Sequence, residues 1–380
     1  MTMKKIIFIS KRTCNIIIFD VIGLAFIHQC VPDSAKLVFL DFRKTFPIGI
    51  SRRFIKGVFL AVFSKPLFAK KSIHYLLLSG LIHHLSPKLL LSFSDNNQIL
   101  AQYAEQNPKL PVVLVQNALR DTMGSISSRF NLPTYLSFGE VEKSIFKNLQ
   151  ITSRRYLPIG SIKLGLALEK TENLEIDSET VAFISHFRPA LVAQNVATIS
   201  KMINEHQQLL FKLTGDFVRS KSLKLRIISK VRNPEEQHLE REYFESLIPD
   251  ISLEFITAYQ GPRELDAYVA GLTSQLIVHP GSTLGFELLG AGKKVLCGAT
   301  VSKDLVEAWG VSHYMDALPT CCKLAPDTDR SDFYEHANRL WEMSDEEYSE
   351  KIKQARHSLM NMPNPIHAHE KLKNIIGSLI

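Results

Sequence analysis

Short apolar segments alternate with helix-forming segments along most of this chain, and this alternation constrains its fold more than any other feature. Lys88–Phe93, Pro111–Val115 and Leu132–Ser137 are predominantly apolar, and polar residues follow the first two directly. Gln98–Gln106 and Val141–Asn148 have the spacing of helices. Strands that alternate with helices predict an α/β fold with parallel sheets.

The alternation occurs twice, which predicts two Rossmann-like domains that face each other across a cleft. A second series of strands begins at Val181–Ser185, after the polar stretch 165–178. A chain of 380 residues is long enough for two domains. We therefore expect an N-terminal domain over 1–165, an interdomain linker over 165–178 and a C-terminal domain over 178–355. The apolar segment Asn15–Ala25 is interpreted as a helix.

The segment 275–297 combines a strand, a glycine turn, a short helix and a second strand. Leu276–Val278 is apolar, and Pro280 ends this strand because proline cannot donate to a sheet. Gly281-Ser282-Thr283 then forms a turn that leads into a helix at Leu284–Leu289. Such a helix start binds anions, because free N–H groups and the positive end of the helix dipole meet there.

Three side chains of this segment are candidates for binding a nucleotide. Ser282 and Thr283 add hydroxyl donors to the anion site, and Glu287 lies one helical turn after Thr283. Because the neighbours of Glu287 are apolar, we expect its carboxylate to face a polar pocket, where a ribose diol is a suitable partner. An ordinary crossover helix with one solvated glutamate explains the pattern equally well, since short glycine motifs are common.

The segment resembles the donor-binding segment of GT-B glycosyltransferases, and His279-Pro280 before Ser282-Thr283 is similar to the CMP-binding motif of bacterial sialyltransferases and Kdo transferases. Val115–Asp121, Phe138-Gly139-Glu140 and Ile159-Gly160-Ser161 occur in the order seen in transferases of bacterial surface-carbohydrate biosynthesis. Ala118 departs from that pattern, because relatives often have glycine there. The resemblance implies a GT-B enzyme whose last helix, 356–380, crosses back to the first domain.

Transfer from a nucleotide sugar needs a stabilised phosphate, an oriented donor and a group that accepts the proton of the acceptor hydroxyl. Asp95 is our candidate for the proton acceptor, since it follows an apolar strand almost directly; the alternative is an N-cap of helix 98–106. Asn117 and Arg120 are candidates for holding the acceptor or the sugar carboxylate. Asp121 and Glu140 are further carboxylates of this domain. The candidates for donor binding, each of which could instead be structural or at the surface, are Arg188, Lys230, Arg232, His279, Ser282, Thr283 and Glu287.

The sequence shows no metal-binding spacing of histidines or cysteines, and we expect a metal-independent enzyme without a cofactor. Asp327-Thr328-Asp329 is interpreted as a solvated turn, and His367 and His369 as surface residues. The five cysteines lack metal spacing, which favours reduced thiols in a cytoplasmic protein. No signal peptide and no apolar run long enough to span a membrane are recognised.

Positive charge is concentrated at the N-terminal end. The chain carries a net +7, but residues 1–92 hold fourteen Lys or Arg against three Asp, a net +11 that leaves −4 for the remainder. An anionic membrane surface or an anionic glycan carrier fits better than nucleic acid, because cations alternate with large apolar residues. Core helices with solvated lysines are the alternative. The residues concerned are Arg52, Arg53, Phe54, Lys56, Phe59, Phe63, Lys65, Phe68, Lys70 and Lys71.

These observations favour a cytoplasmic glycosyltransferase, peripheral on the inner face of the membrane. It would transfer a sugar from a nucleotide donor, best a CMP-linked acidic sugar such as Kdo, to a surface polysaccharide or lipopolysaccharide. An enzyme similar to UDP-N-acetylglucosamine 2-epimerases and a CDP-glycerol glycerophosphotransferase are the alternatives. A binding module without catalysis is a further class, in which Asp95 would be dispensable.

Overall fold

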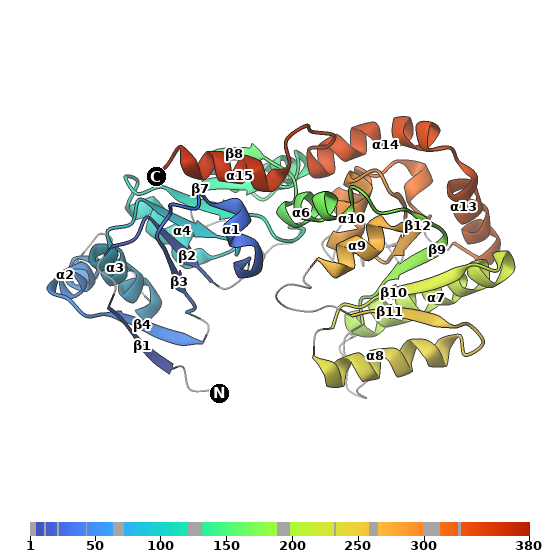
Figure 1. Ribbon diagram of the computed structural model, residues 1–380, viewed down its shortest axis with the longest axis horizontal. Coiled ribbons are helices and arrows are strands. Elements are labelled where there is room, and N and C mark those ends of the chain that lie inside the picture. Colours follow the sequence, from blue (N-terminus) through green and yellow to red (C-terminus); the bar gives the residue numbers. More distant parts are fainter. Residues whose placement is uncertain are drawn as a thin grey trace.

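The computed structural model describes residues 5–10, 13–20, 23–42, 44–63, 72–120, 131–187, 198–231, 233–257, 265–298, 312–325 and 328–380. Two parallel sheets with helices packed around them lie side by side (Figure 1). The predicted α/β class with parallel sheets is confirmed. No helix in these described ranges is long and apolar enough to cross a membrane.

The first sheet has six strands in the order β3-β2-β5-β6-β7-β8. Ile16–Phe19, predicted as part of a helix, forms one of its inner strands. This prediction was wrong because an apolar run has no periodicity that separates a buried strand from a buried helix. All four of these residues are buried, which fits a strand covered on both faces. The strands are β2 (Ile16–Phe19), β3 (Leu37–Leu40), β5 (Leu89–Ser92), β6 (Val112–Val115), β7 (Leu132–Ser137) and β8 (Ser153–Pro158).

Helices follow the strands of this sheet much as the sequence predicts. Asn97 caps α4, because its side-chain oxygen accepts hydrogen bonds from the N–H groups of Ile99 and Leu100. Asp95 is therefore not the cap of this helix, and that alternative is wrong. The helices are α1 (Ile27–Cys30), which follows the short 3-10 turn η1 (Leu24–Phe26), α4 (Gln98–Gln106), α5 (Val141–Asn148) and α6 (Ile162–Thr171).

A smaller layer of two strands and two helices covers one end of the first domain. The strand β1 (Lys5–Ile9) pairs with β4 (Thr45–Gly49) in a separate two-stranded sheet, and the sequence analysis missed β4. α2 (Arg52–Phe63) packs closely on α3 (Ile73–Leu85).

Glycines permit the close packing of these two helices. A Cβ atom at Gly80 would lie 2.7 Å from the ring of Phe54, so only glycine fits there. Phe54 is buried, and its predicted place on a membrane-facing surface is wrong. Lys65, Phe68, Lys70 and Lys71 lie outside the described residues.

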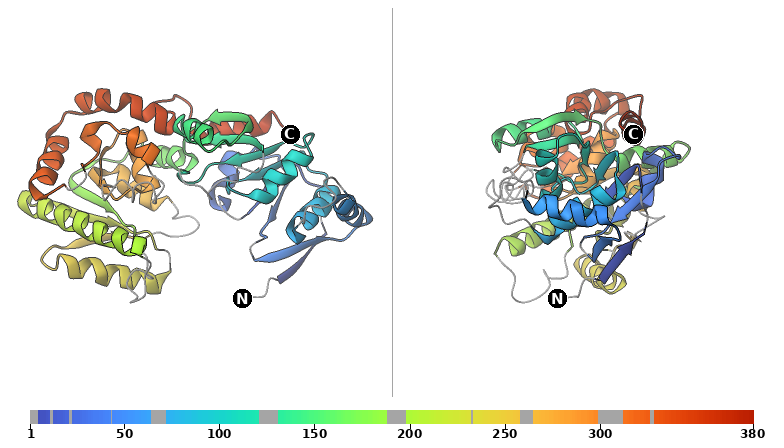
Figure 2. Two further views of the ribbon diagram at one scale, coloured as in Figure 1. Left: turned by 180° about the vertical axis from the view of Figure 1, so that it is seen from behind. Right: turned by 90° about the vertical axis from the view of Figure 1, so that its left-hand side faces the viewer.

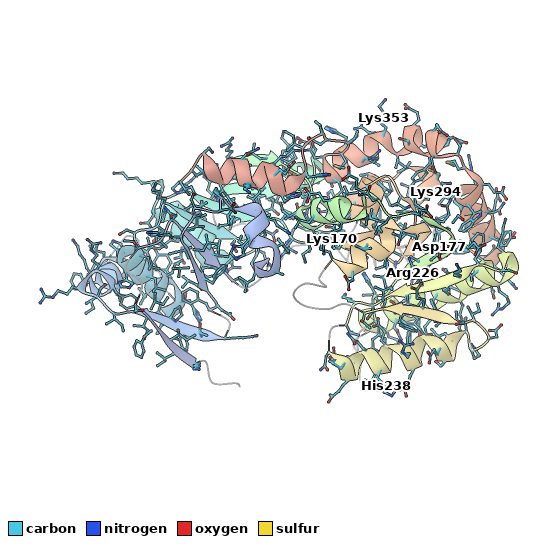
Figure 3. All side chains as sticks on the ribbon, viewed as in Figure 1. Lys170, Asp177, Arg226, His238, Lys294 and Lys353 are labelled. Atoms are coloured by element: carbon cyan, nitrogen blue, oxygen red, sulfur yellow. The ribbon has the colours of Figure 1, made fainter. Side chains whose placement is uncertain are left out.

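The second sheet has five strands in the order β11-β10-β9-β12-β13. Its strands are β9 (Asp177–Ile184), β10 (Lys224–Ile228), β11 (Leu253–Ile256), β12 (Ser274–His279) and β13 (Lys294–Cys297). Its helices are α7 (Thr198–Lys221), α8 (Pro234–Leu247), α9 (Asp266–Leu272), α10 (Thr283–Gly290) and α12 (Ser312–Asp316). Polar side chains such as His238 on α8 and Lys353 near the C-terminus point outward (Figure 3). The strand, turn, helix and strand predicted over 275–297 are all present.

The predicted linker 165–178 is in part a helix. α6 begins after Ser161, whose hydroxyl accepts a hydrogen bond from the N–H of Leu164, and it continues to Thr171. Its residues Leu164, Leu166 and Ala167 are buried, and the helix packs against α9. The polar residues that suggested a linker belong to the exposed end of this helix and to the turn after it.

The C-terminal segment crosses from the second domain back to the first (Figure 1, Figure 2). α13 (Arg330–Glu342) contacts α7 of the second domain, and α14 (Asp345–Met360) contacts α10. α15 (Ala368–Gly377) then packs against α1 and α6. The crossing that the resemblance implied is confirmed, although it uses two helices rather than one over 356–380.

Candidate active site

Asp95 lies at the carboxyl end of β5 and is completely buried. Arg120 binds both of its oxygens, with Nε 2.8 Å from Oδ2 and Nη2 2.6 Å from Oδ1. The hydroxyl of Tyr135 donates to Oδ2 at 2.8 Å. Burial and then the Asp95 carboxylate raise the pKa of Tyr135 well above its usual value, so this hydroxyl stays a donor. In this arrangement both oxygens of Asp95 are engaged within the protein.

The loop after β6 is tied to the end of β5 by its own polar side chains. Asn117 donates through Nδ2 to the carbonyl oxygen of Phe93, and its Oδ1 accepts a hydrogen bond from Nη2 of Arg120 at 2.9 Å. Asn117 and Arg120, predicted to hold acceptor or sugar, thus lie at one edge of the sheet beside Asp95. The carboxyl ends of parallel strands are where α/β domains bind ligands.

Glu142, which the sequence analysis did not select, is a second buried carboxylate at this edge. It accepts hydrogen bonds from Nε2 of Gln116 at 2.7 Å, from the N–H of Gly139 at 3.3 Å and from the hydroxyl of Tyr314 at 2.9 Å. Burial raises the pKa of Glu142 to about 7, although the bonds from Gln116 and Tyr314 act in the opposite direction. Tyr314 belongs to the second domain, so this carboxylate links the two domains.

The loop after β6 also contacts the start of the predicted donor helix. The N–H of Leu119 donates to Oγ1 of Thr283 at 3.3 Å, and the N–H of Arg120 donates to the hydroxyl of Tyr314 at 2.9 Å. The structure thereby places the Asp95–Asn117–Arg120 group of the first domain next to Thr283 of the second. We refer to the end of β5, the loop 116–120 and the start of α10 as the interdomain site.

The start of α10 has the local geometry of an anion site. Gly281 has a φ of 107°, which favours glycine, and Ser282 precedes the first helical residue without a side-chain hydrogen bond that caps the helix. Ser282, Thr283 and Leu284 are each half-buried rather than closed off. An uncapped helix start that remains accessible can bind a phosphate through its N–H groups and dipole.

The ring of His279 is hydrogen-bonded to the turn that precedes α10. It was predicted to contact the nucleotide, but in this structure it contacts the protein backbone. The ring is completely buried, and Nδ1 accepts hydrogen bonds from the N–H groups of Gly281 and Ser282 at 3.1 and 2.9 Å. Burial lowers the pKa of His279 to about 3, so the imidazole is neutral and able to accept. A Cβ atom at Gly285 would lie 2.4 Å from the ring. His279 is therefore a positioning residue in this arrangement.

Glu287 faces the first domain. Its carboxylate accepts hydrogen bonds from the hydroxyl of Ser161 and, at 2.8 and 3.0 Å, from that of Tyr268. It is only 2% exposed, and burial raises its pKa to about 7. The expected polar surroundings of Glu287 are present, but protein hydroxyls supply them here.

The three predicted cations of the second domain are only partly described. Lys230 is exposed and follows β10, whereas Arg188 and Arg232 lie outside the described residues. Between the ends of β9 and β10, the buried Glu240 accepts hydrogen bonds from the hydroxyls of Ser185 and Ser229. Sequence analysis missed this carboxylate, because its neighbours on α8 are charged and solvent-exposed.

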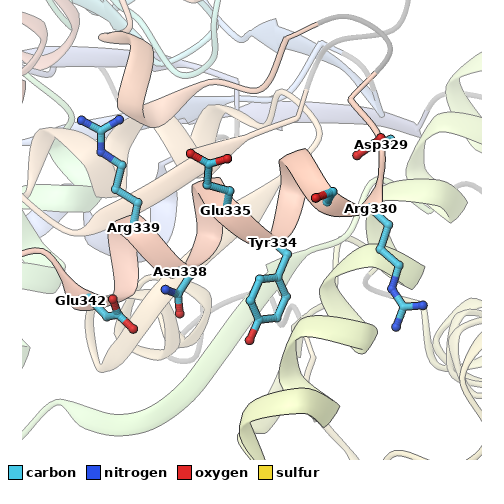
Figure 4. A pocket seen from close by; sticks show the side chains of 8 residues that line it. Asp329, Arg330, Tyr334, Glu335, Asn338, Arg339 and Glu342 are labelled. Atoms are coloured by element: carbon cyan, nitrogen blue, oxygen red, sulfur yellow. The ribbon is translucent and has the colours of Figure 1, made fainter.

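Two further features lie away from the interdomain site. A surface groove of about 990 Å³ runs along α13 (Figure 4), and none of the predicted site residues lines it. Within the described ranges, Glu169, His369 and Glu370 form a cluster close enough to hold a metal ion. His369 was predicted at the surface, but it is buried and bonds to Glu169 at 2.8 Å across α6 and α15. Asp329 of the predicted Asp-x-Asp turn caps α13.

Comparison with known proteins identifies a family and a fold. Residues 113–374 match the family described as "putative O-antigen biosynthesis protein", which is more than half of the chain. No curated protein matches the sequence.

Three solved structures illustrate the fold. A putative UDP-N-acetylglucosamine 2-epimerase from Listeria monocytogenes is 14% identical, with 96% of this chain and 95% of that chain covered and a TM-score of 0.53. S. aureus MnaA with UDP is 14% identical, with 100% and 98% covered and a TM-score of 0.50. A variant of the wall teichoic acid polymerase TagF is 11% identical, with 97% and 89% covered and a TM-score of 0.50. Identities this low indicate the fold alone, and the shared fold agrees with the expected α/β class of parallel sheets.

Proposed function

Because this chain belongs to the family described as "putative O-antigen biosynthesis protein", we propose that it is a metal-independent glycosyltransferase of surface-carbohydrate biosynthesis. Its donor is a nucleotide-activated sugar, best a CMP-linked acidic sugar such as Kdo, and its acceptor is a polysaccharide or lipopolysaccharide. We place the enzyme in the cytoplasm at the inner face of the cell membrane. The observation that carries the proposal is the contact between the loop after β6 and the start of α10.

The start of α10 is the proposed phosphate site. Departure of the sugar leaves negative charge on the nucleotide phosphate, and fixed donors at a helix start stabilise that charge without reorganising. Ser282 and Thr283 provide hydroxyls at the accessible end of α10, and His279 holds the preceding turn in place. Lys230, Arg188 and Arg232 are proposed to add positive charge from the neighbouring strand ends. Glu287 is proposed to bind the ribose once it exchanges a protein hydroxyl for a ribose hydroxyl.

Arg120 connects donor binding to proton transfer in this proposal. A guanidinium binds carboxylates in bidentate fashion, and Arg120 already does so with Asp95. The carboxylate of an acidic sugar bound next to Thr283 would compete with Asp95 for the same group. Once released, Asp95 could accept the proton of the acceptor hydroxyl, as general-base catalysis requires. Asn117, which accepts from Arg120, would keep the guanidinium in position during the exchange.

Calorimetry with CMP, UDP, CDP and GDP tests the site and its preference. We expect CMP to bind most tightly and Thr283→Val to weaken its binding about tenfold or more, because one hydrogen bond to a charged group contributes roughly 1.5–3 kcal/mol. Thr273→Val is the matched control, since Thr273 lies before the opposite end of β12. Equal loss in both variants, or unchanged affinity in Thr283→Val, would remove Thr283 from the site.

The same calorimetry distinguishes the proposed function from the two alternative enzyme classes. Preferential binding of UDP would favour an enzyme like UDP-N-acetylglucosamine 2-epimerases, and preferential binding of CDP would favour a glycerophosphotransferase that uses CDP-glycerol. Binding that survives removal of divalent metals by a chelator is expected for a metal-independent site.

A further inference from the structure

The outer face of α2 is apolar and basic, which is unusual for a helix at the surface of a folded domain. Its inner face, with Phe54, Gly57 and Ala61, is buried against α3. A surface helix ordinarily presents polar residues on the opposite side. Here that side carries no acidic and no neutral polar side chain. Its exposed apolar residues are Ile55 (68% exposed), Phe59 (61%), Leu60 (46%), Val62 (45%) and Phe63 (57%), and its other exposed residues are Arg52, Arg53 and Lys56.

Cations and large apolar side chains occupy different parts of this outer face of α2. Arg52, Lys56, Phe59 and Phe63 are spaced by four, three and four residues, so they lie along one line on the outside of the helix. The cations occupy the first half of this line, and the two rings occupy the second half with their centroids 4.5 Å apart. Aromatic rings beside cations are typical of helices that lie in the interface of a membrane.

A second apolar element lies at the same end of the molecule. The strand β1 exposes Ile6, Ile7 and Phe8, which are 55%, 42% and 64% exposed. β4, its partner, and α2 both belong to the layer that packs around α3 (Figure 1). The exposed apolar surface is therefore not confined to one helix.

We propose that the outer face of α2 docks on an anionic lipid surface, with Phe59 and Phe63 inserted between head groups and with Arg52, Arg53 and Lys56 against lipid phosphates. This inference rests on the proposed function, because it names the surface on which a lipid-linked acceptor would be met. A second copy of the chain is the competing occupant. Two such faces brought together by a twofold axis would place cations near cations without any acidic residue of α2 to compensate, whereas an anionic membrane supplies the complementary charge.

Sedimentation of the whole 380-residue chain with vesicles tests the inference. We expect binding to vesicles of phosphatidylglycerol and phosphatidylcholine, little binding to phosphatidylcholine alone, and loss of binding at high salt. Phe59→Ser with Phe63→Ser should weaken binding at least tenfold, since an inserted aromatic side chain buries a large apolar area. Lys56→Ala should weaken it about fivefold, the equivalent of about 1 kcal/mol for one basic residue near an anionic leaflet.

Leu209→Ser with Leu239→Ser is the matched control, because these leucines are 51% and 45% exposed on α7 and α8 of the second domain. We expect this control to bind vesicles like the wild type. Binding that ignores lipid charge, absence of binding, or an equal loss in both double variants would overturn the inference. So would concentration-dependent dimerisation that Phe59→Ser with Phe63→Ser abolishes, since it would assign the face to a second copy. The sedimentation assay contains neither donor nor acceptor. Absence of vesicle binding would therefore leave the transferase proposal intact, and absence of nucleotide binding would leave the membrane-docking proposal intact.

Discussion

Arg120→Met should destabilise the protein by about 3–5 kcal/mol, because it leaves the Asp95 carboxylate buried without its counter-charge. Asp95 is 0% exposed, and Arg120 binds both of its oxygens. Asp95→Asn should also be destabilising, since it leaves the Arg120 guanidinium largely buried without an anion. The double variant Asp95→Asn with Arg120→Met should be more stable than Arg120→Met alone, because neither charge then remains unpaired. Urea unfolding of all four proteins measures this coupling.

The exposed pair of Lys201 and Glu205 on α7 is the control for this cycle. Both side chains are more than half exposed, and ion pairs of this kind contribute about 0–1 kcal/mol. If the double variant loses as much free energy of unfolding as the two single variants lose together, as happens for distant residues, Asp95 and Arg120 do not act as a pair.

Acid should stabilise this protein through its two buried interdomain carboxylates. Burial raises the pKa values of Glu142 and Glu287 to about 7 from the ordinary 4.5. The folded protein therefore holds these protons more tightly than the unfolded chain, and the resulting stability is complete below about pH 4.5 and lost as pH rises through about 7. A shift of this size corresponds to about 3 kcal/mol for each group.

The free energy of unfolding, measured with urea between about pH 5 and pH 8, should fall as pH rises. Glu142→Gln should make that fall shallower, because glutamine does not titrate, whereas Glu240, whose pKa burial also raises, and His279, whose pKa burial lowers to about 3, titrate alike in both proteins. Asp177 and Asp250 do not interfere, since hydrogen bonds hold their pKa values below the usual range and they titrate at more acid pH. A stability that is flat over this range, or equally steep in Glu142→Gln, would contradict the assignment.

Most strands and helices of this fold could be predicted because each carries a local signal. The strands β5, β6 and β7 are short apolar runs, and α4 and α5 have helical spacing between clear boundaries. The prediction failed at Ile16–Phe19, where a run of buried residues lacks any periodicity, and at α6, where the polar residues of its exposed end obscured the buried face before them. β4 was missed because it contains Pro47, which disfavours strands in general.

The interdomain site was predictable only in part. Asp95 and Arg120 follow the adjacent strands β5 and β6, so their placement at one edge could be foreseen from parallel pairing. Their direct ion pair could not, because it depends on side-chain directions that the spacing does not determine. Glu142, Gln116 and Tyr314 meet across two domains, and no local pattern connects residues that are so far apart in the chain. The burial of Glu287 beside Ser161 depends in the same way on how the domains pack.

Mass spectrometry of the reaction products tests the central claim most directly. The purified protein would be incubated with CMP-Kdo, alone and with a lipopolysaccharide or capsular acceptor, and with UDP-N-acetylglucosamine in parallel. The account predicts release of CMP together with growth of the acceptor by one sugar, and it predicts no product from UDP-N-acetylglucosamine. Conversion of UDP-N-acetylglucosamine to its C2 epimer without any acceptor, with CMP-Kdo left unchanged, would contradict it.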